Sequence, residues 1–214
     1  LYSKLYYALD HIDKNNKLSE SNKLYITKNI VKSIVLLIIT LFSPVIIYNI
    51  WYYQYWNNTL LNHVGSIYVS NDIMGLLRVK KLHLTTKIHH LTTTSLLLYS
   101  FYIDFNQNKI GQLIFMYCMF SCYTFLVNFY LGIRFFKDHR IIKLYIGTIR
   151  ISALNTYVFF CMINWILQVI YIVNFLFMGE IVTQTFVYVS ILIPIIIDDI
   201  KLIKWLYQKK NIEI

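Results

Sequence analysis

The chain has 214 residues, 57% of them hydrophobic, and its mean hydropathy is +0.53. Soluble domains are usually about 45–50% apolar, so this composition argues against an ordinary soluble globular protein. The formal net charge is +10, but the basic residues lie in the gaps between long apolar runs. We therefore expect them to orient membrane helices rather than to bind nucleic acid.

Six apolar runs follow one another along the chain, and crossing the hydrocarbon core takes roughly 20 helical residues. We expect spans at residues 30–53, 60–77, 88–103, 110–133, 151–178 and 181–197. The third run is short and is expected to begin within residues 84–87, whereas the fifth is long enough to be tilted. The prediction is an all-α membrane protein with a cytoplasmic segment 1–29, one transmembrane domain 30–207 and a cytoplasmic tail 208–214.

The gaps between these runs differ sharply in charge. Nineteen of the twenty basic residues lie at the N-terminal end up to Lys32, in the gaps after the second and fourth runs, or beyond the sixth run from Lys201 onward. The opposite gaps hold only Lys109. The positive-inside rule then places both termini in the cytoplasm and requires an even number of spans. The Tyr- and Trp-rich segment 51–56 is expected at the non-cytoplasmic interface, where aromatic side chains gather.

The three cysteines, Cys118, Cys122 and Cys161, all lie inside apolar runs. Their spacing is neither CxxC nor that of a loop-borne pair, so it predicts neither a zinc site nor a disulfide framework. We expect the thiols to pack as small apolar groups. The sequence predicts no metal and no resident cofactor.

Polar residues inside membrane spans are costly and are therefore candidates for function. Asp72 lies near the cytoplasmic end of the second run, and His89 and His90 open the third. Asn128 lies near the end of the fourth run and Asn155 near the start of the fifth. The topology therefore predicts that these groups share one layer in the cytoplasmic half of the bilayer.

Helical phase places further polar residues on common faces. The residues that align at spacings of three or four are Tyr68 with Asp72; His89, Thr93, Leu96 and Ser100; and Tyr117, Ser121, Thr124 and Asn128. Such stripes are unfavourable against lipid, so we expect them to line a shared inward cavity. His90 points about 100° away from His89 on an ideal helix, and we expect it to have a separate role.

Structural explanations for these residues stay open. Serine and threonine stripes often only hold membrane helices together, and Asn128 and Asn155 can serve as interhelical hydrogen-bond partners. Asp72 can form a salt bridge with Arg78 or Lys80 near the interface. Adjacent histidines at the start of a span can also be packing groups.

The segment 71–105 resembles the core of the TLC domain, the membrane domain of ceramide synthases, translocating-chain-associating membrane proteins and the TLC-domain-containing proteins. The resemblance rests on an Asp late in one span, a basic loop and a His-His pair that opens the next span. The ceramide synthase signature begins HHxxTxxLxxxSY. The residues that match it are His89, His90, Thr93, Leu96 and Ser100, whereas Phe101 stands where the signature has Tyr. The resemblance implies a barrel-like ring of helices around a cavity of acyl-chain size.

The departures from this signature bear on activity. The family signature continues with LHD and SD elements, which by resemblance help to form the acyl-transfer centre. In their place stand residues 117–119, Tyr-Cys-Met, and 121–122, Ser-Cys. The chain therefore resembles the small TLC-domain-containing proteins, several of which are linked to membrane lipid composition, more than true ceramide synthases.

Two functional hypotheses follow. In the first, the protein binds lipids or acyl chains in the endoplasmic reticulum membrane and influences lipid composition, with Asp72 and His89 fixing a polar group. In the second, it is an acyl-CoA-dependent N-acyltransferase in which His89 is the base or nucleophile, Asp72 orients it and His90 assists. Acyl-CoA is then the only co-substrate, and its phosphates meet the basic loop 78–87. The short loops and the lack of an inverted repeat argue against a translocon partner and a transporter.

Overall fold

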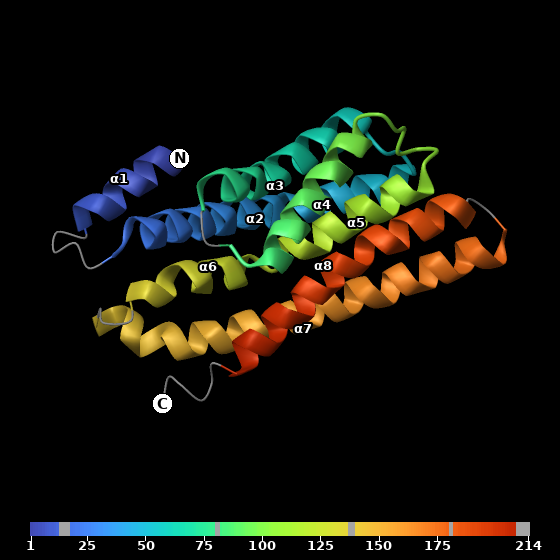
Figure 1. Cartoon of the computed structure of the whole chain (residues 1–214). Coiled ribbons are helices and arrows are strands. Elements are labelled where there is room, and N and C mark those ends of the chain that lie inside the picture. Colours follow the sequence, from blue (N-terminus) through green and yellow to red (C-terminus); the bar gives the residue numbers. More distant parts are fainter. Residues whose placement is uncertain (13–17, 80–81, 137–139, 180–181, 209–214) are drawn as a thin grey trace.

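The computed structural model describes residues 1–12, 18–79, 82–136, 140–179 and 182–208, and all regular structure in these segments is helical. The all-α prediction is confirmed. The elements, coloured along the chain in Figure 1, are α1 (Tyr2–Ile12), α2 (Glu20–Tyr53), α3 (Asn58–Arg78), α4 (Leu84–Ser100), α5 (Lys109–Cys122), α6 (Phe125–Ile133), the 3₁₀ turn η1 (Arg134–Phe136), α7 (Arg140–Phe177) and α8 (Val182–Gln208).

Local signals set the ends of several helices. The side chain of Asn57 accepts a hydrogen bond from the Leu60 amide at 3.0 Å and caps α3. Asn108 caps α5 in the same way, through the Gly111 amide at 2.7 Å. Such caps satisfy amides that the first helical turn leaves unpaired. Gln54, with φ 52°, takes the left-handed conformation that ends α2.

Each predicted span falls on one helix or, for the fourth, on the α5–α6 pair. By length and composition, α2 and residues Ile142–Phe177 of α7 can each cross a membrane, and the α5–α6 pair counts as a third candidate if it is one span. The chain is thus a helical protein with two or three membrane-spanning candidates among the described residues. The six-span count stays a prediction. Of the expected tail 208–214, only Gln208 lies within the described residues.

The fourth span was expected to be continuous but is bent by 46° between α5 and α6. Two hydroxyls of its polar stripe explain the bend. Ser121 Oγ donates to the Tyr117 carbonyl at 2.9 Å, and Thr124 Oγ1 donates to the Ser121 carbonyl at 2.6 Å. The Thr124 amide bonds the same carbonyl in a tighter turn at 3.2 Å. Side-chain hydroxyls that compete for backbone carbonyls commonly bend helices.

The long helices form a closed ring. Each helix contacts the next in the order α2, α3, α4, α8, α7 and α6, and α6 contacts α2 and closes the ring. Gly132 permits the last contact, since a Cβ at this position would lie 2.5 Å from the Ile30 Cδ1. Because of the bend, α5 departs from the direction of α6 and contacts α3 and α8 as well as α2 and α7. One end of the ring is thereby filled by α5, and space is left toward the other end.

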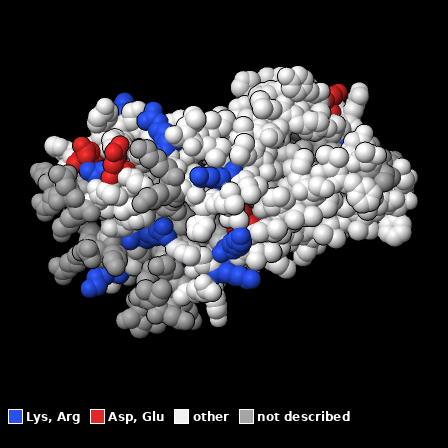
Figure 2. All heavy atoms as spheres, in the orientation of Figure 1, with Lys and Arg blue, Asp and Glu red and all other residues white. Residues whose placement is uncertain are grey.

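The outer surface has the character expected in lipid. Large apolar side chains on the outer faces of α2 and α7 are exposed, among them Leu41, Phe42, Phe159 and Ile166. Contiguous apolar surface of this kind marks a membrane or partner contact. Figure 2 shows basic residues gathered over the half of the molecule that carries both termini in Figure 1, while the other half is almost free of charge. The charge asymmetry expected from the sequence is therefore also a spatial one.

Candidate functional site

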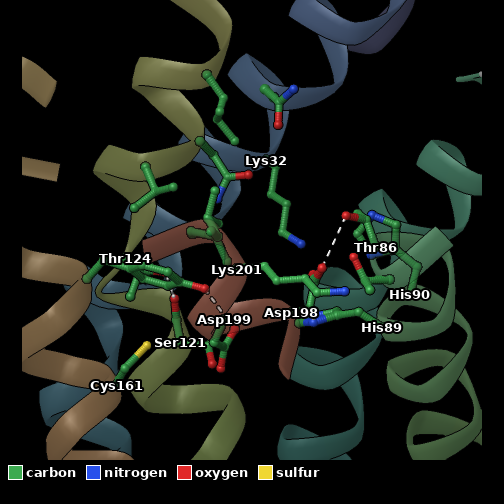
Figure 3. Close-up of a pocket in the computed structure, with 18 of the residues that line it drawn as sticks. Lys32, Thr86, His89, His90, Ser121, Thr124, Cys161, Asp198, Asp199 and Lys201 are labelled. Atoms are coloured by element: carbon green, nitrogen blue, oxygen red, sulfur yellow. Dashed lines mark hydrogen bonds and ion pairs between the residues drawn. The ribbon is translucent and has the colours of Figure 1, made fainter. Parts of the chain in front are cut away.

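A cavity of about 520 Å³ lies inside the ring toward the end that carries the termini. Every helix from α2 to α8 contributes to its wall, α3 through Tyr68 alone. The residues expected there from the sequence that do line it are Tyr68, His89, His90, Tyr117, Ser121, Thr124 and Asn128. In Figure 3 the histidines and Thr86 lie on one side and Ser121, Thr124 and Cys161 on the opposite side, with Lys32 and Asp198 between them. Seven of the residues expected to face inward therefore share one cavity.

Asp72 lies directly behind the cavity wall and is completely buried. One carboxylate oxygen, Oδ1, forms an ion pair with Lys32 of α2. The other oxygen, Oδ2, accepts a hydrogen bond from Thr93 Oγ1 at 3.3 Å. The alternative that Asp72 pairs with Arg78 is wrong, because the Arg78 guanidinium lies over the Tyr2 ring at 5.4 Å. Lys80 lies outside the described residues.

His90 is enclosed on both sides of its ring. Its Nδ1 lies 3.2 Å from Asp72 Oδ1, and its Nε2 lies 3.3 Å from the Lys28 Nζ. A lysine ammonium can only donate, so Nε2 is the acceptor and the ring proton sits on Nδ1, facing the carboxylate. A neutral His90 held in this way has a charged protein group within 3.3 Å of each ring nitrogen. It is a structural connection between Lys28 and Asp72.

His89 occupies a different environment. Its Nδ1 lies 3.5 Å from Asp198 Oδ2, and Asp198 also accepts a hydrogen bond from Thr86 Oγ1 at 3.3 Å. The two histidine rings are nearly perpendicular, with centroids 5.7 Å apart. The sequence hypothesis has Asp72 orient His89, but no ion pair joins these two described residues, although their polar atoms lie within 4.8 Å of each other. Asp72 contacts His90 instead, because successive residues on a helix point in different directions, and the carboxylate beside His89 comes from α8.

A second carboxylate of α8 is held by phenols. Asp199 is buried and accepts hydrogen bonds from Tyr117 Oη at 2.5 Å and from Tyr157 Oη at 2.7 Å. These three residues come from α8, α5 and α7 and line the cavity together. Tyr117 thus has a defined role, which is to tie α5 to α8 at the site.

Three predicted residues lie apart from the main cavity. Thr93 and Ser100 line a second space of about 70 Å³ between α3, α4, α5 and α8. Ser100 Oγ donates to Asn62 Oδ1 at 2.9 Å, so this residue joins α4 to α3. Asn155 is exposed on α7 and lines neither space. Its expected inward position is wrong, since the rotation of α7 turns Ala153 and Tyr157 inward instead.

The donor atoms of Asp72, His89 and His90 lie within 4.8 Å of one another, as the ligands of a metal ion would. Carboxylate and imidazole donors suit zinc or iron. In this structure, however, Lys32 is paired with the same carboxylate and Lys28 lies against His90. A divalent cation would have to displace one ammonium and sit beside the other in a poorly solvated place. The arrangement therefore suits an ion-paired proton network better than a metal.

Sequence reasoning missed six charged residues of this cavity: Lys28, Lys32, Arg134, Asp198, Asp199 and Lys201. The sequence analysis treats the four cations only as charges that set topology, although the spacing of four between Lys28 and Lys32 places them on one helix face. The two aspartates follow directly on the apolar run 191–197, and the rule that ionisable residues at spans are functional candidates applies to them. The sequence predicts that the sixth span ends at Ile197, which leaves both aspartates just outside it.

Comparison with protein-family models, with curated proteins and with solved structures found no match to this chain. The resemblance to the TLC domain therefore remains a prediction from the residues that carry it.

Proposed function

We propose that this chain is a multi-pass membrane protein that binds a lipid or acyl chain in the cavity inside its helical ring. The observation that carries the proposal is the cavity itself, about 520 Å³ in volume and lined by both ionisable and aromatic side chains. Pockets of this size and mixed character are typical of small-ligand sites. An apolar chain would contact aromatic residues such as Phe120 and Phe160, and a polar group would meet the charged cluster.

The proposal includes six spans with both termini in the cytoplasm. The α5–α6 pair supplies one span, and α3, α4 and α8 complete an even number with α2 and α7. The spatial separation of charge supports this topology, because the positive-inside rule gathers basic residues on one side. A thiol introduced as Asn106→Cys should react with an impermeant reagent only from the non-cytoplasmic side, and one introduced as Lys143→Cys only from the cytoplasmic side. Reaction of both from the same side would refute the topology.

Lipid binding is tested by native mass spectrometry of the full chain purified in mild detergent. We expect a co-purifying lipid whose occupancy falls in Ser121→Phe, where the larger side chain fills the cavity. Ser190→Phe is the matched control, because Ser190 is exposed on α8 and lies outside both cavities. Equal occupancy in the two variants, or repeated recovery of an empty protein, would contradict the proposal.

By its resemblance to the small TLC-domain-containing proteins, the protein would reside in the endoplasmic reticulum membrane and influence membrane lipid composition. Deletion in the native host should therefore change the distribution of lipid classes or acyl chains. Complementation by the wild type but not by Ser121→Phe would connect that change to the cavity. An unchanged lipid profile would argue against this part of the proposal.

Acyl transfer from acyl-CoA is the second candidate, and the position of His89 favours it. The ring lines the cavity with 15% of its side chain exposed, and Asp198 lies beside its Nδ1. A carboxylate at this distance would orient a catalytic imidazole if it accepts the Nδ1 proton. Membranes given acyl-CoA and a sphingoid base should form product with wild type and with His63→Ala, an exposed control. Product should fall at least about 100-fold in His89→Ala, and equal product in all three would exclude the activity.

A further inference from the structure

Four cationic side chains line the cavity, and only one of them forms an ion pair with a carboxylate of the described residues. Lys32 is paired with Asp72, whereas Lys28, Arg134 and Lys201 form no ion pair with a carboxylate of the described residues. Lys28 is the most telling of these, because it is only 4% exposed and its nearest polar partner is a histidine nitrogen. A buried cation without an anionic partner is costly. Its retention points to an anion that is supplied from outside the chain.

The carboxylates of the cavity are meanwhile satisfied by other groups. Asp198 contacts His89 and Thr86, and Asp199 accepts hydrogen bonds from two tyrosine hydroxyls. With the Lys32–Asp72 pair taken as neutral, three cations face two carboxylates around the same space. The wall therefore keeps one excess positive charge. A monoanion such as a phosphodiester would neutralise it.

Aromatic contacts bring the three cations toward one level of the cavity. The Arg134 guanidinium lies over the Tyr25 ring at 5.5 Å and over the Trp205 ring at 4.6 Å. On α2, Lys28 follows Tyr25 by three residues, and on α8, Lys201 precedes Trp205 by four. One helical turn rises about 5.4 Å, so Lys28 and Lys201 each lie about one turn from the ring that holds Arg134. The guanidinium sits between α2 and α8 at the end of the cavity near the termini.

We propose that this end of the cavity, formed by Lys28, Arg134 and Lys201, binds the phosphate of a phosphate-bearing lipid headgroup. Arg134 presents a planar fork of donors that matches phosphate oxygens, and the two lysines add ammonium donors at the sides. Stacking on Tyr25 and Trp205 fixes the plane of the fork. The inference rests on the proposed lipid-binding function and specifies its ligand as a phosphate ester rather than a neutral lipid.

The test compares two lipids that differ only in the headgroup. The purified full chain is titrated with phosphatidylglycerol and with diacylglycerol of identical acyl chains, and occupancy is read by native mass spectrometry. We expect a preference for phosphatidylglycerol of about tenfold or more, as charge-assisted hydrogen bonds imply. Lys28→Met and Arg134→Gln should each abolish most of this preference, and Arg134→Lys should restore only part of it, because an ammonium lacks the fork.

Lys143→Met is the matched control, since Lys143 is an exposed cation of α7 that does not line the cavity. It should leave the preference unchanged. Displacement of phosphatidylglycerol by millimolar inorganic phosphate would support the phosphate site with free phosphate as an alternative source, whereas resistance to displacement would support the headgroup. Equal binding of both lipids, or a preference that survives both cavity variants, would overturn the inference while leaving lipid binding intact. Absence of binding by either lipid would instead contradict the proposed function.

Discussion

The two ends of the helical ring handle polar groups in opposite ways. At the end formed by the α2–α3 and α4–α5 connections, Asp104 Oδ1 accepts hydrogen bonds from the side chains of Asn58 and Asn106, at 2.9 and 3.0 Å. Beneath this network the rings of Trp56, Phe105 and Phe115 pack edge to face. At this end, side-chain amides satisfy the carboxylate by hydrogen bonds, and aromatic rings fill the space below it.

At the end near the termini, charged groups surround open space. Lys28 and Arg134 have no carboxylate partner among the described residues, and both line the cavity together with the two histidines. A polar group that is satisfied within the chain contributes to stability, whereas one that is not is available to a ligand. We therefore expect the closed end to contribute mainly to stability and the open end mainly to binding. The buried network around Asp72 is the exception, because it lies near the open end and contributes to stability.

The largest effect is expected from Asp72→Ala, which leaves Lys32 buried without its partner. Breaking a buried ion pair by removing one member costs about 3–5 kcal/mol, or about 10 °C in the Tm of a chain of this size. Thermal unfolding in detergent measures the shift. The double variant Asp72→Asn with Lys32→Met should recover part of it, and a loss as large as that of Asp72→Ala would show that the pair is not the source.

A smaller loss is expected from Tyr157→Phe, which removes one of the two hydroxyls that bind Asp199. A hydrogen bond to a charged group contributes about 1.5–3 kcal/mol. The free energy of unfolding in a denaturant titration should fall by about this amount. Tyr171→Phe serves as the control because Tyr171 is 40% exposed. If both variants are equally stable, the Tyr157–Asp199 contact does not hold α7 to α8.

The closed end is probed by Phe115→Leu, which loosens the packing of Phe115 against Trp56 and Phe105. The loss of ring contacts should cost about 1 kcal/mol. Lipid occupancy in native mass spectrometry should stay at the wild-type level, because Phe115 does not line the main cavity. A drop in lipid occupancy at unchanged stability would break the division between the two ends.

The smallest effect concerns pH at the closed end. Hydrogen bonds from Asn58 and then from Asn106 lower the pKa of Asp104 below its ordinary value. A lowered pKa in the folded state gives stability that is present above the unfolded pKa of about 3.9 and is lost as the pH falls through the folded value. The Tm of the wild type should therefore decline more steeply below pH 4 than that of Asp104→Asn. Parallel curves would show that the carboxylate contributes nothing measurable, since it is fully exposed to screening.

The sequence located the site residues of α3 and α4 because their signals are local. Asp72 and the His89–His90 pair are ionisable groups at the ends of apolar runs, and such groups are expected to face inward. The same local reasoning failed for Asn155, because helical phase says which residues share a face but not which face turns inward. Local reasoning also predicted one straight helix for the fourth run, with Ser121 and Thr124 on a continuous polar face. In the structure the hydroxyls of these two residues bend the helix.

Three properties of the sequence alone, its composition, the length of its apolar runs and its charge asymmetry, determined much of the fold. They indicated that the chain is helical, which segments form the long helices and at which end the basic residues gather. These properties depend on neighbours in the chain and on the surrounding solvent. Only the tertiary structure decided the partners: Asp72 with Lys32 and His90, and His89 with Asp198. Asp198 lies more than one hundred residues beyond His89, and closure of the ring between α4 and α8 brings them together. Contacts of that kind depend on how whole helices rotate and pack, which no local pattern specifies.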